Sequence, residues 1–142
     1  MNPHDPSPLI SLATAYWGSA TLIAAIRLAL FDHLSAPTTV EALSESLSID
    51  DVALDGLLVA LLSLELISRD EGGRYHNTEL TERFLVTSSP QSIAAALLYN
   101  GDVYPLWGQL DEVIKRGDTS RDPQAYLGQD EGHTRRFVYG MH

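Results

Sequence analysis

Cysteine is missing from this sequence of 142 residues. Its absence excludes a disulfide framework, a thiol nucleophile and a cysteine-ligated zinc site. Basic residues are scarce: nine Lys and Arg stand against nineteen Asp and Glu, which gives a formal net charge of −10. This acidic excess favours solubility and disfavours a nucleic acid or another polyanion as a partner.

Motifs of catalysis and cofactor binding are also missing. The sequence contains no G-x-G, so no glycine-rich nucleotide loop is predicted. The five histidines have no metal-ligand spacing, and neighbouring acids fall in expected caps, turns or polar helix faces. We therefore predict no catalytic residue, no cofactor-binding residue and no metal site in this chain. The N-terminus, MNPHDPSP, lacks the basic region of a signal peptide, so a cytoplasmic protein is expected.

The first long segment, residues 8–34, is strongly apolar and is expected to be helical from Pro8 onward. It carries no charge from Leu9 to Ile26, and its apolar residues cover nearly the whole helix. Eighteen such residues just reach the length of a membrane span, but polar residues interrupt the run and no basic flank anchors it, so no membrane span is predicted. A helix that is apolar all round must be buried on several sides. A domain of this size has too little mass to surround it, so we predict a homodimer through this first helix.

The next segment, residues 38–85, has the pattern of a winged helix. Thr38 or Thr39 is the expected cap of a short helix, and Asp50 is the expected cap of a second one. Two short strands follow, at residues 66–68 and 75–78, around a turn that contains two glycines. The order helix, turn, helix and hairpin predicts a winged-helix element.

A winged helix suggests DNA binding, but the charges argue against it. Residues 38–68 contain six acids and no Lys or Arg. A recognition helix of this composition repels phosphates, whereas a DNA-binding protein needs several cations for counterion release. We therefore predict no nucleic-acid partner.

The remaining sequence is expected to be helical with breaks. One helix is predicted over residues 90–99 and is expected to end at Asn100 and Gly101. Another is predicted over residues 104–116, closed by Gly117. A last helix is expected after Glu131, where Phe137 and Met141 share a face that suits a planar aromatic ligand. Because this apolar face is still running at His142, we expect a larger protein.

These elements give four predicted parts in a mainly α fold. They are an N-terminal arm with the dimerisation helix (1–34), a winged-helix element with a small β-hairpin (35–89), a helical dimerisation and substrate-proximal segment (90–128), and the start of a linker helix (129–142).

The order of these parts resembles the N-terminal dimerisation region of small-molecule O-methyltransferases that use S-adenosylmethionine. The resemblance rests on the apolar first helix, the acidic winged helix, a W-x-x-L helix (Trp107 to Leu110) that ends in Lys-Arg-Gly, and the final R-F-x-x-x-M-H. In that family a Rossmann-like catalytic domain with the cofactor loop comes next, and this chain lacks it.

The resemblance implies roles for particular positions. Phe137 and Met141 match linker-helix residues that line the pocket of the hydroxyl acceptor, which is aromatic or polyketide-like. Tyr16 and Trp17 lie on the first helix, which in the family reaches toward the partner subunit's pocket. S-adenosylmethionine is implied for the full-length enzyme and not for this part alone, which is not expected to be active by itself.

Two alternatives remain open at this stage. One is a winged-helix transcriptional regulator or protein-interaction module, which the charge pattern disfavours. The other is a separate subunit that completes a methyltransferase encoded in two pieces.

Overall fold

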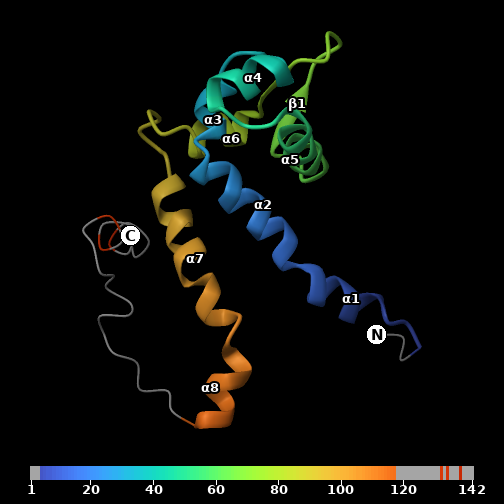
Figure 1. Cartoon of the computed structure of the whole chain (residues 1–142), viewed down its shortest axis with the longest axis vertical. Coiled ribbons are helices and arrows are strands. Elements are labelled where there is room, and N and C mark those ends of the chain that lie inside the picture. The colour runs from blue at the N-terminus through green and yellow to red at the C-terminus, as the bar shows by residue number, and fades with distance from the viewer. Residues whose placement is uncertain (1–3, 118–131, 133, 135–137, 139–142) are drawn as a thin grey trace.

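The computed structural model describes residues 4–117 and, further along the chain, residues 132, 134 and 138. Its main part is a compact head, from which two helical arms extend and diverge (Figure 1). One arm precedes the head in sequence and the other follows it. The predicted mainly helical fold with a small two-stranded hairpin is confirmed.

The N-terminal arm consists of α1 (Ser7–Thr14) and α2 (Tyr16–Arg27). Ala15 between them is right-handed helical, with φ −54° and ψ −29°, so the two helices run almost as one rod (Figure 1). Together, residues 7–27 are long and apolar enough to cross a membrane by length and composition alone, with a mean hydropathy of 1.6. Only 11% of the most apolar 18-residue window in this stretch is buried within the chain, and α1 has no buried residue.

The helix expected to continue toward residue 34 instead stops after Arg27. Ala29 has φ 53°, a left-handed conformation that costs an L-residue roughly 1–2 kcal/mol, and α3 (Leu30–His33) follows it. The reversal places Leu30 and Phe31 in the core, at 0% and 1% exposure. The burial of these two side chains offsets the conformational cost of the turn. The sequence does not reveal this helix end, because its apolar pattern continues through Ala29.

The helix-turn-helix of the head consists of α4 (Val40–Leu47) and α5 (Asp51–Ser63), and both begin at the expected caps. The Thr39 hydroxyl accepts a hydrogen bond from the N–H of Ala42, and the Asp50 carboxylate accepts from two N–H groups in the first turn of α5. Each cap satisfies backbone donors that the helix itself leaves unpaired, which typically contributes about 1 kcal/mol.

The wing is a hairpin of β1 (Ile67–Arg69) and β2 (Tyr75–Asn77), which pair antiparallel as predicted. Gly73 has φ 79°, the positive value that the tight turn requires. The Asp70 carboxylate accepts hydrogen bonds from the backbone N–H and the Nε–H of Arg74, each at 2.9 Å. The backbone hydrogen bond is the largest cause that lowers the pKa of Asp70.

The hydrophobic core lies inside the head and at the roots of the two arms. Its buried apolar residues come from the end of α2, α3, α4, α5, the hairpin, the loop after α6 (Glu79–Phe84) and the first turn of the following helix: Ala25, Ile26, Leu30, Phe31, Leu34, Leu43, Leu54, Leu58, Leu61, Ile67, Tyr75, Leu85, Val86 and Ala94. The head therefore anchors both arms, while their outer parts contribute nothing to its core.

The second arm consists of α7 (Ala94–Trp107) and α8 (Leu110–Arg116). Gly117 ends α8 with φ 65°, as predicted. The prediction that Asn100 and Gly101 end a helix is wrong, because α7 continues through both. The helix breaks instead inside the W-x-x-L motif, between Trp107 and Leu110.

The reason for this error is a close contact between the two arms. A Cβ placed on Gly101 would lie 2.5 Å from Cγ2 of Ile23 on α2 and 3.0 Å from the guanidinium of Arg27. Gly101 is thus required where α7 crosses α2 at close range, and its helix-breaking tendency is overridden by that packing.

Replacing Gly101 with Ala is therefore expected to destabilise the chain by roughly 1–3 kcal/mol, because the branched Ile23 side chain has to move. Gly56 in α5 is the matched control, since a Cβ there meets nothing within 4 Å. Gly56→Ala should stabilise by up to about 1 kcal/mol through helix propensity. Urea unfolding measures the change in the free energy of unfolding for each variant. Equal changes in the two variants would contradict the packing role of Gly101.

Candidate functional site

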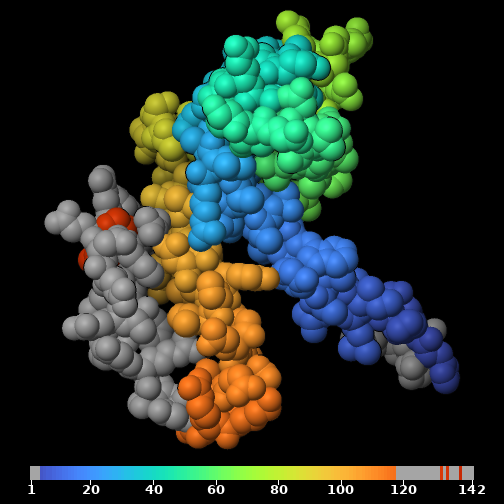
Figure 2. Space-filling model, in the orientation of Figure 1, coloured from blue at the N-terminus to red at the C-terminus, as the bar shows by residue number. Residues whose placement is uncertain are grey.

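A groove of about 600 Å³ lies between α2 and α7, where the arms leave the head (Figure 2). Small and aliphatic side chains form most of its walls. The α2 side includes Ala20, Ile23 and Ala24, and the α7 side includes Leu97 and Gly101. A volume of this size is typical of binding sites, and the two helices that form it are held together at the Gly101 contact.

Charge is nearly absent from the groove. Arg27 is the single charged residue among those that line it, and its guanidinium donates to the Asp102 carboxylate of α7 at 3.4 Å. This ion pair links the two arms at the surface, where such pairs are worth little in stability. The groove therefore presents apolar surface and one neutralised cation.

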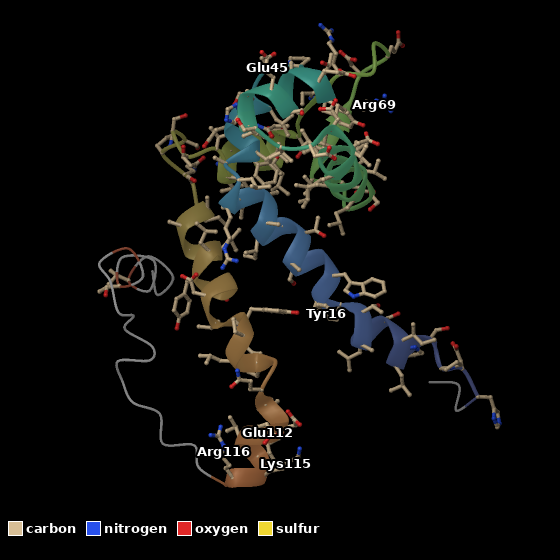
Figure 3. The ribbon with its side chains drawn as sticks, in the orientation of Figure 1. Tyr16, Glu45, Arg69, Glu112, Lys115 and Arg116 are labelled. Carbon is tan, nitrogen blue, oxygen red and sulfur yellow. The ribbon has the colours of Figure 1, made fainter. Side chains whose placement is uncertain are left out.

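Three aromatic rings meet at the outer end of the groove. Tyr16 lies 6.2 Å from Trp17 in an edge-on arrangement and 6.3 Å from Tyr104 of α7, measured between ring centroids. Tyr16 is labelled in Figure 3, on the side of the N-terminal arm that faces α7. About half or more of each ring is exposed, so this aromatic cluster offers ring faces and edges to a ligand or to another chain.

The outer parts of both arms are apolar and uncovered. α1 has no buried residue, and its Leu9 and Leu12 are 73% and 76% exposed. On the other arm, Trp107 and Ile114 are both 69% exposed. Contiguous apolar surface of this kind marks an interaction site, since single exposed apolar residues are ordinary but runs of them are not.

Two of the four predicted acceptor-binding residues can be placed. Tyr16 and Trp17 lie in the aromatic cluster at the start of α2. Phe137 and Met141 lie outside the described residues. Sequence reasoning did not assign Tyr104 or Asn100 to a site, although both line the groove. The run of small residues on α2 was the one available signal, because it predicts the close approach of another helix.

A second hollow, of about 370 Å³, lies beside the hairpin and is polar. Its buried Asn77 connects three elements: the Nδ2 group donates to the Phe31 carbonyl at 2.8 Å and to the Glu82 carboxylate at 2.6 Å. These bonds tie β2 to α3 and α6. We interpret this hollow as a structural feature of the head, in which these hydrogen bonds stabilise the packing of the three elements.

The polar contacts of the head are consistent with packing roles. The Tyr75 hydroxyl donates to Asp55 at 3.4 Å, and burial raises the pKa of Tyr75, which suits a packing role. Among the described residues, no group of three or more His, Asp or Glu side chains is placed to hold a metal ion. The described sheet has only two antiparallel strands, so it provides no strand-to-helix loop for a nucleotide.

Comparison with known sequences supports a methyltransferase context. A sequence model of the O-methyltransferase dimerisation domain matches residues 10–87, which include all of α2 and most of α1. The N,N-dimethyltransferase OxyT of Streptomyces rimosus is 31% identical over 120 residues, covering 83% of this chain and 35% of that protein. The polyketide 8-O-methyl transferase TcmO of Streptomyces glaucescens is 30% identical over 124 residues, covering 83% and 37%. The chain thus spans about a third of the length of these relatives.

Comparison with solved structures agrees. Human N-acetylserotonin methyltransferase, solved in complex with S-adenosylmethionine, superposes with a TM-score of 0.82 at 27% identity. The superposition covers 99% of this chain and 46% of the human protein. The head and both arms therefore match the arrangement in a larger methyltransferase.

The acidic α5 generates a prediction about nucleic acid. Random duplex DNA at low salt should form no complex with this chain, because residues 38–68 contain six acids and no Lys or Arg. An electrophoretic mobility shift, with a basic winged-helix protein as the positive control, measures this. A shifted band that disappears as salt is raised would support the regulator alternative instead.

Proposed function

Because the chain belongs to the family of O-methyltransferase dimerisation domains, we propose that it is the dimer-forming and acceptor-side part of a methyltransferase that uses S-adenosylmethionine. The acceptor in this proposal is a small hydroxyl compound, aromatic or polyketide-like. The observation that carries it is the uncovered α1–α2 rod, which lies almost entirely within the matched residues 10–87.

The rod is the proposed surface of dimerisation. The family model describes a dimerisation domain over residues 10–87, and no other described helix is as apolar and as uncovered over such a length as this rod. Stable interfaces bury about 800 Å² on each partner, and apolar area contributes roughly 25 cal/mol per Å² before the costs of association. The large apolar side chains that the rod exposes, among them Leu9, Ile10 and Leu12, are the proposed contribution to such an interface. A second chain, rather than a lipid bilayer, covers it in this proposal, which is consistent with a cytoplasmic protein.

The aromatic cluster is the proposed contribution to the acceptor pocket. Tyr16 and Trp17 present partly exposed rings close to a third ring, Tyr104, and such rings pack well against a flat aromatic compound. Phe137 and Met141 are proposed as a further wall on the basis of the family resemblance. The relatives TcmO and OxyT are named for transfer to oxygen and to nitrogen, so acceptors of both kinds belong in any test.

The cofactor is assigned to another part of the enzyme. S-adenosylmethionine supplies the methyl group when bound, but the residues of this chain do not fit it: the sequence has no G-x-G, and the described strands form only a hairpin. No residue of this chain is proposed to take part in the methyl-transfer step. The proposed role of the chain is to join two subunits and to form the acceptor side of the site.

If the dimer forms through the rod, substitutions on the rod should abolish dimerisation while the head stays folded. Leu9→Asp combined with Leu12→Asp is expected to produce folded monomers, because neither side chain contributes to the core and each Asp would place a charge in the interface. Val59→Asp on α5, at a site 54% exposed, is the matched control and should stay dimeric. Light scattering after gel filtration gives the mass, and circular dichroism gives the fold. A folded dimer of the double variant would contradict the proposed interface.

The function itself is tested with a chimaera that joins this chain to the remaining part of TcmO. The chimaera is expected to bind S-adenosylmethionine in calorimetric titration and to methylate members of a panel of phenolic and amine acceptors. The 142-residue chain alone should give no saturable binding. Trp17→Ala in the chimaera should raise KM for the acceptor several-fold and leave cofactor binding unchanged.

Two outcomes would contradict this proposal. One is a dimeric chimaera that binds the cofactor and transfers no methyl group to any acceptor. The other is saturable micromolar cofactor binding by the chain alone, which would show that the cofactor is assigned to the wrong part.

A further inference from the structure

We propose that the polar hollow beside the hairpin binds a primary ammonium group, of the kind that a small alkylamine carries. The hollow has a volume of about 370 Å³, and its walls come from the loop between α3 and α4, the hairpin and the first turn of α6. It lies in the head, away from the rod and from the aromatic cluster. This binding site is therefore independent of both the proposed dimer and the proposed acceptor pocket.

One buried oxygen atom, Oδ1 of Asn77, carries this proposal. Asn77 lines the hollow and is 8% exposed, and its Nδ2 group donates both hydrogens, to the Phe31 carbonyl and to the Glu82 carboxylate. These two acceptors fix the orientation of the amide, because a reversed amide would place Oδ1 against two other acceptors. In the part of the chain that the structure describes, Oδ1 is the one buried side-chain nitrogen or oxygen without a hydrogen-bond partner. A buried acceptor without a partner is costly, so this atom indicates a ligand that donates a hydrogen bond.

Other side chains that line the hollow are acceptors as well. Glu79 and Glu82 are three positions apart on α6, so their carboxylates lie on the same face of that helix. The His76 ring donates from Nδ1 to the Asn77 carbonyl at 2.9 Å, which leaves Nε2 as an acceptor when the ring is neutral. The hollow therefore favours a ligand with several N–H donors.

The charge of the hollow favours a cation. Asp70 also lines it but is already paired, since its carboxylate lies 2.8 Å from a guanidinium nitrogen of Arg74. Glu79 and Glu82 add two further negative charges, and no Lys or Arg is among the described residues that line the hollow. Acidic residues are common at the start of a helix, so these two alone would indicate no ligand. The oxygen of Asn77 is the independent observation.

A primary ammonium group fits these acceptors better than a metal ion does. Mg²⁺ and Ca²⁺ need oxygens that converge at roughly 2.0–2.6 Å, and the described residues contain no group of three or more His, Asp or Glu side chains placed in that way. An ammonium group donates three hydrogen bonds over roughly 2.7–3.2 Å, so it tolerates acceptors that lie further apart. Leu34 and Pro37 line the same hollow and provide apolar contact for a short alkyl chain.

NMR spectroscopy of the isotope-labelled chain tests this site, with propylammonium chloride as the probe. Titration should shift the side-chain amide signals of Asn77 in a saturable way, with a dissociation constant on the order of 1 mM for so small a ligand. Tetramethylammonium chloride is the matched probe, because it has the same charge and no N–H donor, and it should cause no saturable shift. Saturable shifts of the same size and affinity with both salts would contradict the proposal.

Two substitutions distinguish a defined site from general attraction to an acidic chain. Glu79→Gln removes one charge from the hollow and should weaken propylammonium binding about threefold or more, since a hydrogen bond to a charged acceptor is the stronger one. Glu79 is exposed, so the head should stay folded. Glu71→Gln in the turn of the hairpin is the matched control, because Glu71 does not line the hollow and the net charge changes equally. Equal weakening in the two variants would overturn the proposal.

Thermal unfolding gives an independent measurement. Propylammonium at about ten times its dissociation constant should raise the melting temperature by several degrees, because a ligand that binds only the folded chain stabilises it. Tetramethylammonium at the same concentration should not, and an equal effect of the two salts would contradict the proposal.

Two further results would overturn the assignment of the hollow. One is a propylammonium titration that leaves the Asn77 signals of the folded chain unchanged. The other is a titration in which MgCl₂ or CaCl₂ shifts these signals at lower concentration than propylammonium does, which would identify a metal site instead. Neither result bears on the homodimer, because the mass of the chain in solution measures that separately.

Discussion

The α1–α2 rod exposes large apolar side chains, among them Leu9, Leu12 and Trp17, that the rest of the chain does not cover. The chain places 21 apolar-rich residues in a nearly straight helix, yet only 11% of its most apolar 18-residue window is buried. The head buries the inner end of the rod through Ala25 and Ile26 and leaves the outer end in water. Because exposed apolar area is costly and the chain belongs to a family of dimerisation domains, a second chain is the proposed cover for this surface.

A second constraint is the close crossing of α2 and α7. Gly101 allows the two helices to approach at Ile23, and from that point they diverge to form a groove with apolar walls. The same crossing brings Tyr104 of α7 within 6.3 Å of Tyr16, measured between ring centroids, so the aromatic cluster depends on the packing at Gly101. A change at this one packing contact is therefore expected to affect both the proposed dimer surface and the proposed acceptor surface.

Local chemistry explains which features could be predicted from the sequence. The caps at Thr39 and Asp50, the hairpin turn at Gly73 and the end of α8 at Gly117 depend on residues within a few positions of each other. Distant contacts explain the errors. Gly101 lies inside a helix because of Ile23, 78 positions earlier, and Ala29 adopts a left-handed turn because Leu30 and Phe31 are drawn into the core.

The candidate site was only partly predictable for the same reason. Tyr16 and Trp17 were assigned through the family resemblance, whereas the groove beside them is formed by two segments far apart in sequence.

The exposed apolar rod should bring two copies of the chain together. Sedimentation equilibrium of the unmodified chain at micromolar concentration measures whether it does. A homodimer has a mass about twice 15.6 kDa, whereas a folded species that stays at 15.6 kDa would show that the rod does not drive association.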